Sequence, residues 1–199
     1  MEFSGTFELE DVTIEAVWLA LSDPELLAQA APGCEFAERV DDPDNVDFEA
    51  LRERAQSRDA PSILPEATPA DVRARAIDEG AHYAAVFGVK VGAVNPTFEA
   101  TATVTKREFP EMHAEASGAS SDSSFEVRSG MRLHDRDGTV EVEWWGDSDV
   151  FGRVAQMGQR VMNPVANRLV NRFFSDVAER VSDIDIDEET RAAIAEETA

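Results

Sequence analysis

The chain has 199 residues, of which 43% are hydrophobic, and this length favours one domain built on a single sizeable core. The 41 acidic residues outnumber the 18 basic ones and give a formal net charge of −23, which excludes sequence-general nucleic-acid binding because such binding requires a positive surface. Cys34 is the only cysteine, so an internal disulfide and a zinc site made of cysteines are both excluded.

The charge imbalance also bears on the environment of the protein. Mutual repulsion at this net charge destabilises a compact fold in dilute buffer, and molar salt relieves it because the Debye length falls to about 3 Å. Lys90 and Lys106 are the only lysines. This composition is similar to that of halophilic cytoplasmic proteins, and the alternative is an acidic mesophilic protein. The first ten residues lack the features of a signal peptide and no stretch could span a bilayer, so we expect a cytoplasmic protein.

The first forty residues show the periodicities of a strand, two short helices and a second strand. Apolar residues alternate from Glu2 to Leu9, as they do in a half-buried strand. Thr13 is a suitable N-cap for a helix that follows it, and a second helix begins at Pro24 and ends before Pro32 and Gly33. Cys34 to Val40 is predicted to be the next strand.

The segment from about 42 to 79 has the character of an insertion. Phe48, Leu51 and Ala55 predict one small helix, and Thr68 followed by Pro69 predicts the start of another. Two interpretations remain open: a solvated insertion, or a lid over a cavity.

Strands dominate from Ala81 onward, where apolar residues alternate with polar ones through several segments. An Asp137-Gly138 pair predicts a tight hairpin turn. We expect an antiparallel meander that is covered on one side only.

The stretch from Phe151 to Val181 predicts one long amphipathic helix, because its apolar residues recur at intervals of three and four. Pro164 lacks a backbone donor, so we expect a bend or a local break near Asn163. Four arginines and no acidic residue lie between Phe151 and Ser175: Arg153, Arg160, Arg168 and Arg172. Either these arginines dock a partner, or they cover apolar surface and pair with surface acids.

Three segments carry a resemblance to a known family: SDPELLAQAAPGCEF from Ser22, VKVGAVNPTFEATATV from Val89, and DVFGRVAQMGQRVMNPVANRLVNRFF from Asp149. With the element order, they make the chain resemble the START-like (SRPBCC) helix-grip superfamily, and within it the carbon monoxide dehydrogenase G-subunit family. The resemblance implies an α+β fold in which a curved antiparallel sheet wraps around a long carboxy-terminal helix with an apolar cavity between them. The domain is expected to span residues 1–182, followed by an acidic, disordered tail at 183–199.

The resemblance also implies a function. Members of this family are accessory proteins of molybdenum-containing carbon monoxide dehydrogenases and related hydroxylases, linked to membrane recruitment or to a lipophilic redox partner such as a quinone. We therefore expect a non-catalytic protein with no covalent cofactor, whose partners are hydroxylase subunits and a lipophilic molecule. It would work in the cytoplasm or at the inner face of the membrane, without an anchor. A START-like enzyme of the polyketide cyclase or dehydratase type, and a purely structural assembly factor, are the alternatives.

Candidate ligand-binding residues are the inward-facing aromatic residues of the strands and the apolar residues opposite them on the long helix: Phe87, Phe98, Phe125, Trp144, Met157, Val161 and Val165. They either line a pocket or fill a core. The three histidines are dispersed and no nucleophile has an adjacent base motif, so we expect neither a metal site nor a catalytic residue. Cys34 is either a small packing residue or a reactive thiol.

Overall fold

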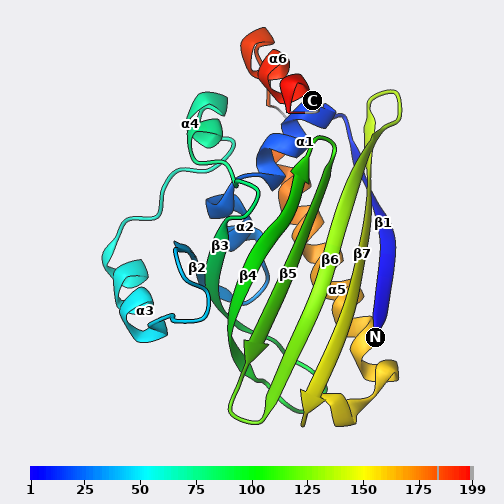
Figure 1. Cartoon of the computed structure of the whole chain (residues 1–199). Coiled ribbons are helices and arrows are strands. Elements are labelled where there is room, and N and C mark those ends of the chain that lie inside the picture. The colour runs from blue at the N-terminus through cyan, green and yellow to red at the C-terminus, as the bar shows by residue number, and fades with distance from the viewer. Residues whose placement is uncertain (183, 198–199) are drawn as a thin grey trace.

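A seven-stranded antiparallel sheet wraps around one long helix in the computed structural model, which describes residues 1–182 and 184–197. The strands are β1 Glu2–Glu10, β2 Cys34–Val40, β3 His82–Gly88, β4 Thr97–Glu108, β5 Glu111–Ala119, β6 Ser123–Asp135 and β7 Thr139–Gly152, in the order β1-β7-β6-β5-β4-β3-β2. The helices are α1 Ile14–Leu21, α2 Pro24–Ala30, α3 Phe48–Ser57, α4 Pro69–Ala74, the 3-10 helix η1 Ala155–Met157, α5 Gln159–Val181 and α6 Glu188–Glu196 (Figure 1).

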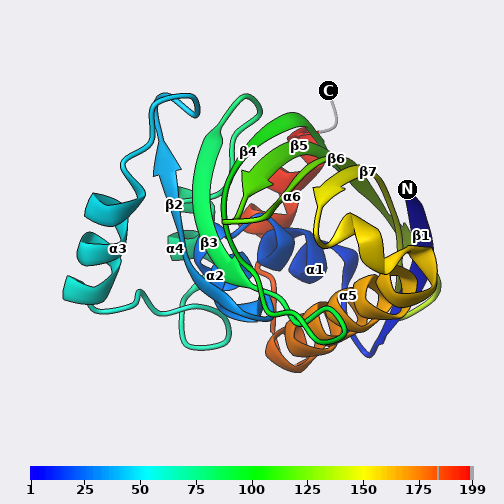
Figure 2. The same ribbon diagram turned by 90° about the horizontal axis from the view of Figure 1, so that it is seen from below.

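The core lies on the concave side of the sheet, where α1, α2 and α5 pack (Figure 2). Helix α1 is buried along almost its whole length, and Trp18 at its centre is 0% exposed. Residues from β6, β7 and α5, including Leu133, Val142 and Val177, complete the same cluster. The α+β helix-grip architecture predicted from the sequence is confirmed.

The amino-terminal helices begin where the sequence predicted, because their caps are local. Thr13 accepts a hydrogen bond from the Ala16 N–H at 3.3 Å, and Asp23 accepts one from the Glu25 N–H at 3.1 Å. Gly33 follows in the left-handed region with φ of 81°, and a Cβ there would lie 2.1 Å from the Gly88 carbonyl oxygen. Only glycine fits this approach of two strands.

The predicted helix from Phe151 to Val181 is correct only from Gln159 onward. Strand β7 continues through Gly152, and the chain then turns through η1 to Gly158, where φ is 70°. The break therefore lies at Gly158 and not near Asn163, since α5 is continuous through Asn163 and Pro164. Pro164 is the sixth residue of α5, so it removes one helical hydrogen bond, to the Arg160 carbonyl oxygen, but the helix continues through it.

The sheet is covered on both sides at one edge, contrary to the expectation of a single covered face. Ala84 and Val86 of β3 are fully buried, and they pack with Phe36 of β2 against Leu51 of α3 on the outside of the sheet. Helix α3, the predicted first helix of the insertion, thus covers the outer face of the sheet at its β2 edge.

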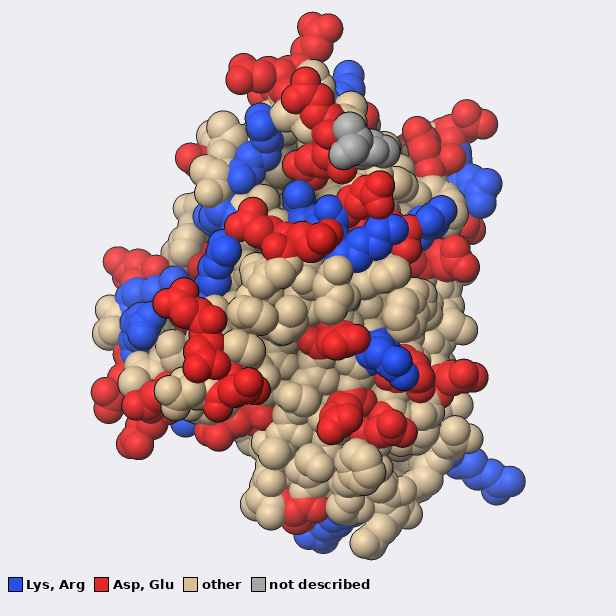
Figure 3. All heavy atoms as spheres, in the orientation of Figure 1, with Lys and Arg blue, Asp and Glu red and all other residues tan. Residues whose placement is uncertain are grey.

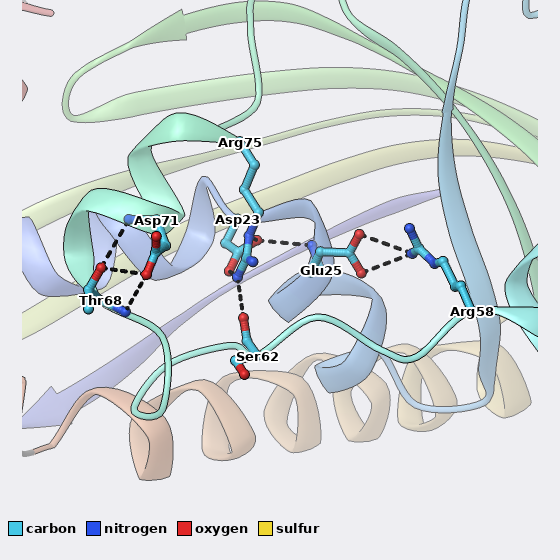
Figure 4. A network of polar contacts seen from close by, with 7 residues as sticks. All are labelled: Asp23, Glu25, Arg58, Ser62, Thr68, Asp71 and Arg75. Atoms are coloured by element: carbon cyan, nitrogen blue, oxygen red, sulfur yellow. Dashed lines mark hydrogen bonds and ion pairs between the residues drawn. The ribbon is translucent and has the colours of Figure 1, made fainter.

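The second half of the insertion is fastened to α2 by ion pairs (Figure 4). Arg75 donates from Nε and Nη2 to the two carboxylate oxygens of Asp23 at 2.8 and 2.7 Å, and also to the Ser62 carbonyl oxygen at 2.7 Å. Arg58 lies 3.0 Å from both Glu25 and Glu38. The insertion is therefore packed onto the domain.

The segment expected to be a disordered tail contains α6, whose Thr190 and Ile194 are buried. Asp187 caps this helix by accepting a hydrogen bond from the Thr190 N–H at 2.7 Å. Ile194 reaches an apolar surface next to α1, which the tail sequence alone does not reveal. No helix among the described residues is long and apolar enough to cross a membrane.

Candidate functional site: an apolar groove beside the long helix

An apolar groove of about 400 Å³ lies between α5 and the concave face of the sheet. Its wall combines the ends of α1 and α2, the start of β5, the middle of β6 and β7, and the second half of α5. The residues that line it are Leu21, Leu27, Ala31, Pro32, Met112, His113, Ala114, Ser129, Gly130, Met131, Trp144, Trp145, Leu169, Val170, Phe173 and Phe174.

The strand register explains why the floor of the groove is apolar. Met112 pairs with Met131, and Met131 pairs with Trp144, so these three side chains lie side by side on the concave face. Gly5 on β1 is opposite Trp144, and a Cβ at Gly5 would lie 3.0 Å from the indole ring. The absence of a side chain at Gly5 lets the Trp144 ring extend across β1.

Polar groups in the groove are few. The Ser129 hydroxyl donates to the Ala114 carbonyl oxygen at 3.4 Å. His113 lies on the opposite strand face from Met112, with Nε2 2.6 Å from a Glu111 carboxylate oxygen. Its ring meets that of Trp145 edge-on at 5.5 Å, and Trp145 is 40% exposed. Such a lining suits a ligand that is bound by its apolar surface.

The seven candidate ligand-binding residues fall into two places. Phe87, Phe98, Phe125, Met157, Val161 and Val165 lie together in one hydrophobic cluster near the start of α5. The rings of Phe98 and Phe125 meet edge-on at 5.4 Å, and Phe98 is 4% exposed. Trp144 of β7 lies in the groove, opposite the second half of α5.

The groove also contains residues that the sequence analysis did not select. Leu169 and Phe173 belong to the apolar stripe of α5, and Met112 and Met131 belong to strands with alternating apolar residues. The periodicity therefore predicts that these four side chains point toward the interior. The angle and position at which α5 crosses the sheet decide which strand residues face each turn of the helix. The sequence carries no signal for this crossing.

The four candidate docking arginines are all exposed. Arg153 lies 3.6 Å from Asp122. Arg160, Arg168 and Arg172 recur at intervals of four or eight along α5, and make no ion pair within 4.0 Å among the described residues. Asn163, Asn167 and Asn171 are exposed beside them. This outer face of α5 is therefore cationic and free of acidic side chains up to Asp176.

The opposite surface of the molecule is acidic. Figure 3 shows the outer face of the sheet, with acidic side chains scattered across it. A polar hollow of about 430 Å³ on this face is lined by Glu115, Glu126, Asp147 and Asp149 with Arg128. Because its walls are charged and open to solvent, it does not suit a lipophilic ligand.

Residues with catalytic or metal-binding potential are not gathered at the groove. The described residues contain no group of three or more His, Cys, Asp or Glu side chains placed to hold a metal ion. Burial raises the pKa of the Cys34 thiol to about 11, which disfavours the reactive thiolate.

A curved antiparallel sheet closed by a long helix, with an apolar groove between them, defines a START-like helix-grip protein. Solved structures share this fold. A conserved protein from Geobacillus kaustophilus has 21% identity and a TM-score of 0.67, covering 92% of this chain and 95% of its own. The Zhui aromatase/cyclase from Streptomyces sp. R1128 has 10% identity and a TM-score of 0.55, covering 91% and 93%. A START superfamily protein from Mycobacterium smegmatis has 12% identity and a TM-score of 0.53, covering 90% and 96%.

The particular family follows from the carboxy-terminal half. Residues 75–182, more than half of the chain, match the family model of CoxG, the G-subunit of carbon monoxide dehydrogenase. The chain therefore belongs to the CoxG family. No curated protein matches the chain.

Proposed function

We propose that the chain is a non-catalytic accessory protein of a molybdenum-containing carbon monoxide dehydrogenase or a related hydroxylase, and that its groove binds a lipophilic molecule such as a quinone. In this role it assists assembly of the enzyme or its coupling to membrane quinone. Membership of the CoxG family supports the partner, and the groove of about 400 Å³ beside α5 supports the ligand class.

The chemistry of the groove is the observation that carries the proposal. Leu169, Val170 and Phe173 of α5 face Met131 and Trp144 of the sheet. Burying apolar ligand surface contributes about 25 cal/mol per Å², so a small ring compound with few polar groups gains most from this site. Thioethers adapt to irregular apolar ligands, and two methionines lie on the floor.

A quinone titration tests the ligand. We expect a short-chain ubiquinone to quench the tryptophan fluorescence of the wild-type protein saturably, since Trp144 and Trp145 both line the groove. Leu169→Arg places a charge in the groove and should weaken binding at least about tenfold, since an unpaired charge is costly in an apolar site. Asn171→Arg adds the same charge on the exposed face of α5 and is the matched control. Equal binding by both variants, or no saturable quenching in the wild type, would refute the proposed ligand site.

The outer face of α5 is the proposed docking surface for the hydroxylase. Eleven of the 16 arginines pair with carboxylates within 4.0 Å among the described residues. Five lack such a partner there, Arg54, Arg73, Arg160, Arg168 and Arg172, and three of these five lie on α5. Arginine is favoured in protein interfaces, and the exposed asparagines between these arginines add hydrogen-bonding groups.

Co-purification tests the docking surface. Arg160→Glu combined with Arg168→Glu should abolish recovery of the hydroxylase with the tagged protein. Arg54→Glu combined with Arg136→Glu makes the same charge change at exposed positions on α3 and beside β6, and should leave recovery intact. Full recovery with the α5 double variant would show that these arginines have no docking role.

An enzyme of the cyclase type is the alternative, favoured by the fold shared with the aromatase/cyclase. It would require a proton donor or acceptor at the groove. The ionisable side chain in the lining is His113, which is directed to Glu111 on the outer strand face. Turnover of a polyketide-like substrate that is lost in His113→Ala would favour the enzyme.

A further inference from the structure

Another pocket, of about 350 Å³, lies between α1, α4 and α6. Trp18 and Leu19 of α1, Ala70 of α4 and Ile194 of α6 form apolar walls. Arg73 and Arg107 line the same pocket. A cationic site with apolar walls is unexpected in a chain with a net charge of −23.

Arg107 is held in place by several contacts. Its Nη2 donates to the Ser22 hydroxyl at 3.2 Å, and its guanidinium carbon lies 5.3 Å from the centroid of the Trp18 ring. The side chain is 13% exposed, and its Nε is buried without a hydrogen-bond partner among the described residues. A buried guanidinium with an unused donor is costly unless an anion is nearby.

The anion at this position comes from the chain itself. Oε2 of Glu197, the residue after α6, accepts a hydrogen bond from the Trp18 indole N–H at 2.9 Å and lies 3.0 Å from Nη1 of Arg107. Indole N–H and guanidinium together bind one carboxylate oxygen, and the apolar walls continue beyond it. This is the arrangement that an amphiphilic carboxylate requires.

Two observations indicate that the Glu197 carboxylate can be exchanged. The Glu197 side chain is 29% exposed, and α6 itself buries only Thr190 and Ile194. Arg73 is exposed and makes no ion pair within 4.0 Å in the described part of the chain, so the pocket has two guanidinium groups for one carboxylate.

We propose that the pocket between α1, α4 and α6 is a binding site for a small amphiphilic carboxylate, and that Glu197 occupies it in the free protein. An external carboxylate therefore competes with a tethered one, whose effective concentration is in the millimolar range for a short link. Removing the Glu197 charge exposes the site.

Hexanoate is the probe, and 1-hexanol is its uncharged control. The readout is the indole N–H resonance of Trp18, assigned with Trp144→Phe and Trp145→Phe. In Glu197→Gln, hexanoate should shift this resonance saturably, with an apparent Kd at least about tenfold lower than in the wild type. Hexanol should cause no such shift.

Cation variants test the recognition. Arg73→Gln, at an exposed position, should weaken hexanoate binding to the Glu197→Gln protein about threefold to tenfold, and Arg107→Gln should abolish it. Leu169→Arg blocks the groove beside α5 and should leave the Trp18 shift unchanged. If hexanoate shifts the Trp18 resonance of Glu197→Gln no more than hexanol does, or if Arg73→Gln and Arg107→Gln both bind hexanoate unchanged, the contact only fastens α6 and the proposal is wrong.

Discussion

Arg75→Ala should lower the free energy of unfolding by about 3 kcal/mol, because it removes the ion pair that joins the insertion to α2. Asp23 is 0% exposed and receives two hydrogen bonds from Arg75 at 2.8 and 2.7 Å (Figure 4). Without Arg75, its carboxylate keeps the Glu25 N–H at 3.1 Å. Breaking a buried pair from one side usually costs about 3–5 kcal/mol, and the 25% exposure of Arg75 sets the expected value at the lower end.

A double-mutant cycle isolates the pair. Asp23→Asn keeps an oxygen that can cap α2 but removes the charge. In that background Arg75→Ala should cost only about 1 kcal/mol, which gives a coupling energy of about 2 kcal/mol. Urea unfolding in molar potassium chloride is the assay, because salt screens a buried pair weakly. The Tm of Arg75→Ala should fall by about 6–12 °C.

Arg39→Ala is the matched control. Arg39 lies 3.0 Å from Asp78, but the two side chains are 58% and 66% exposed, so the pair should contribute less than about 1 kcal/mol. A coupling energy below about 0.5 kcal/mol between Asp23 and Arg75 would refute the reasoning. So would equal costs for Arg75→Ala and Arg39→Ala.

Three further predictions concern stability. Hydrogen bonds from Lys106 and Arg132 lower the pKa of Glu111 from 4.5 to about 2. Glu111→Gln should therefore lower the Tm above about pH 4.5, and the difference in Tm from the wild type should vanish toward pH 2. A difference in Tm that persists at pH 2 contradicts this prediction. Gly33→Ala should lower the free energy of unfolding, measured with urea, by more than about 2 kcal/mol, and Gly138→Ala by about 1 kcal/mol. Both glycines have a positive φ, but of the two only Gly33 would place its new Cβ against a backbone oxygen. Equal losses for the two variants would contradict this prediction. If the acid excess is adaptive, the Tm should rise steeply from about 0.1 to 2 M potassium chloride, and a flat profile would count against adaptation.

The sequence predicted elements well where the signals are local. Strand β2 has the predicted bounds, Cys34 to Val40, because Gly33 precedes it and a run of acidic residues follows. Helix α1 begins after its predicted cap, Thr13, and α2 begins at Pro24 as predicted, with Asp23 as its cap. These signals act within a few residues, so no knowledge of the remaining fold is needed.

The predictions failed where distant surfaces decide. The apolar spacing continues smoothly from Phe151 to Val181, but β7 ends at Gly152, and α5 begins only after Gly158, whose φ is 70°. Ile194 is 1% exposed only because α6 meets the surface beside α1. Alternation placed Trp144 on the concave face correctly, but its position along α5 depends on how helix and sheet cross.

Methionine-methyl NMR tests the central claim, that the groove beside Trp144 holds the ligand. Met112 and Met131 line the groove, whereas Met157 and Met162 lie in the cluster with Phe87, Phe98 and Phe125. Titration of [¹³C-methyl]methionine-labelled protein with a short-chain ubiquinone should shift the Met112 and Met131 signals saturably and leave Met157 and Met162 unchanged. Saturable shifts confined to Met157 and Met162, or no saturable shift at any methionine, would contradict the account.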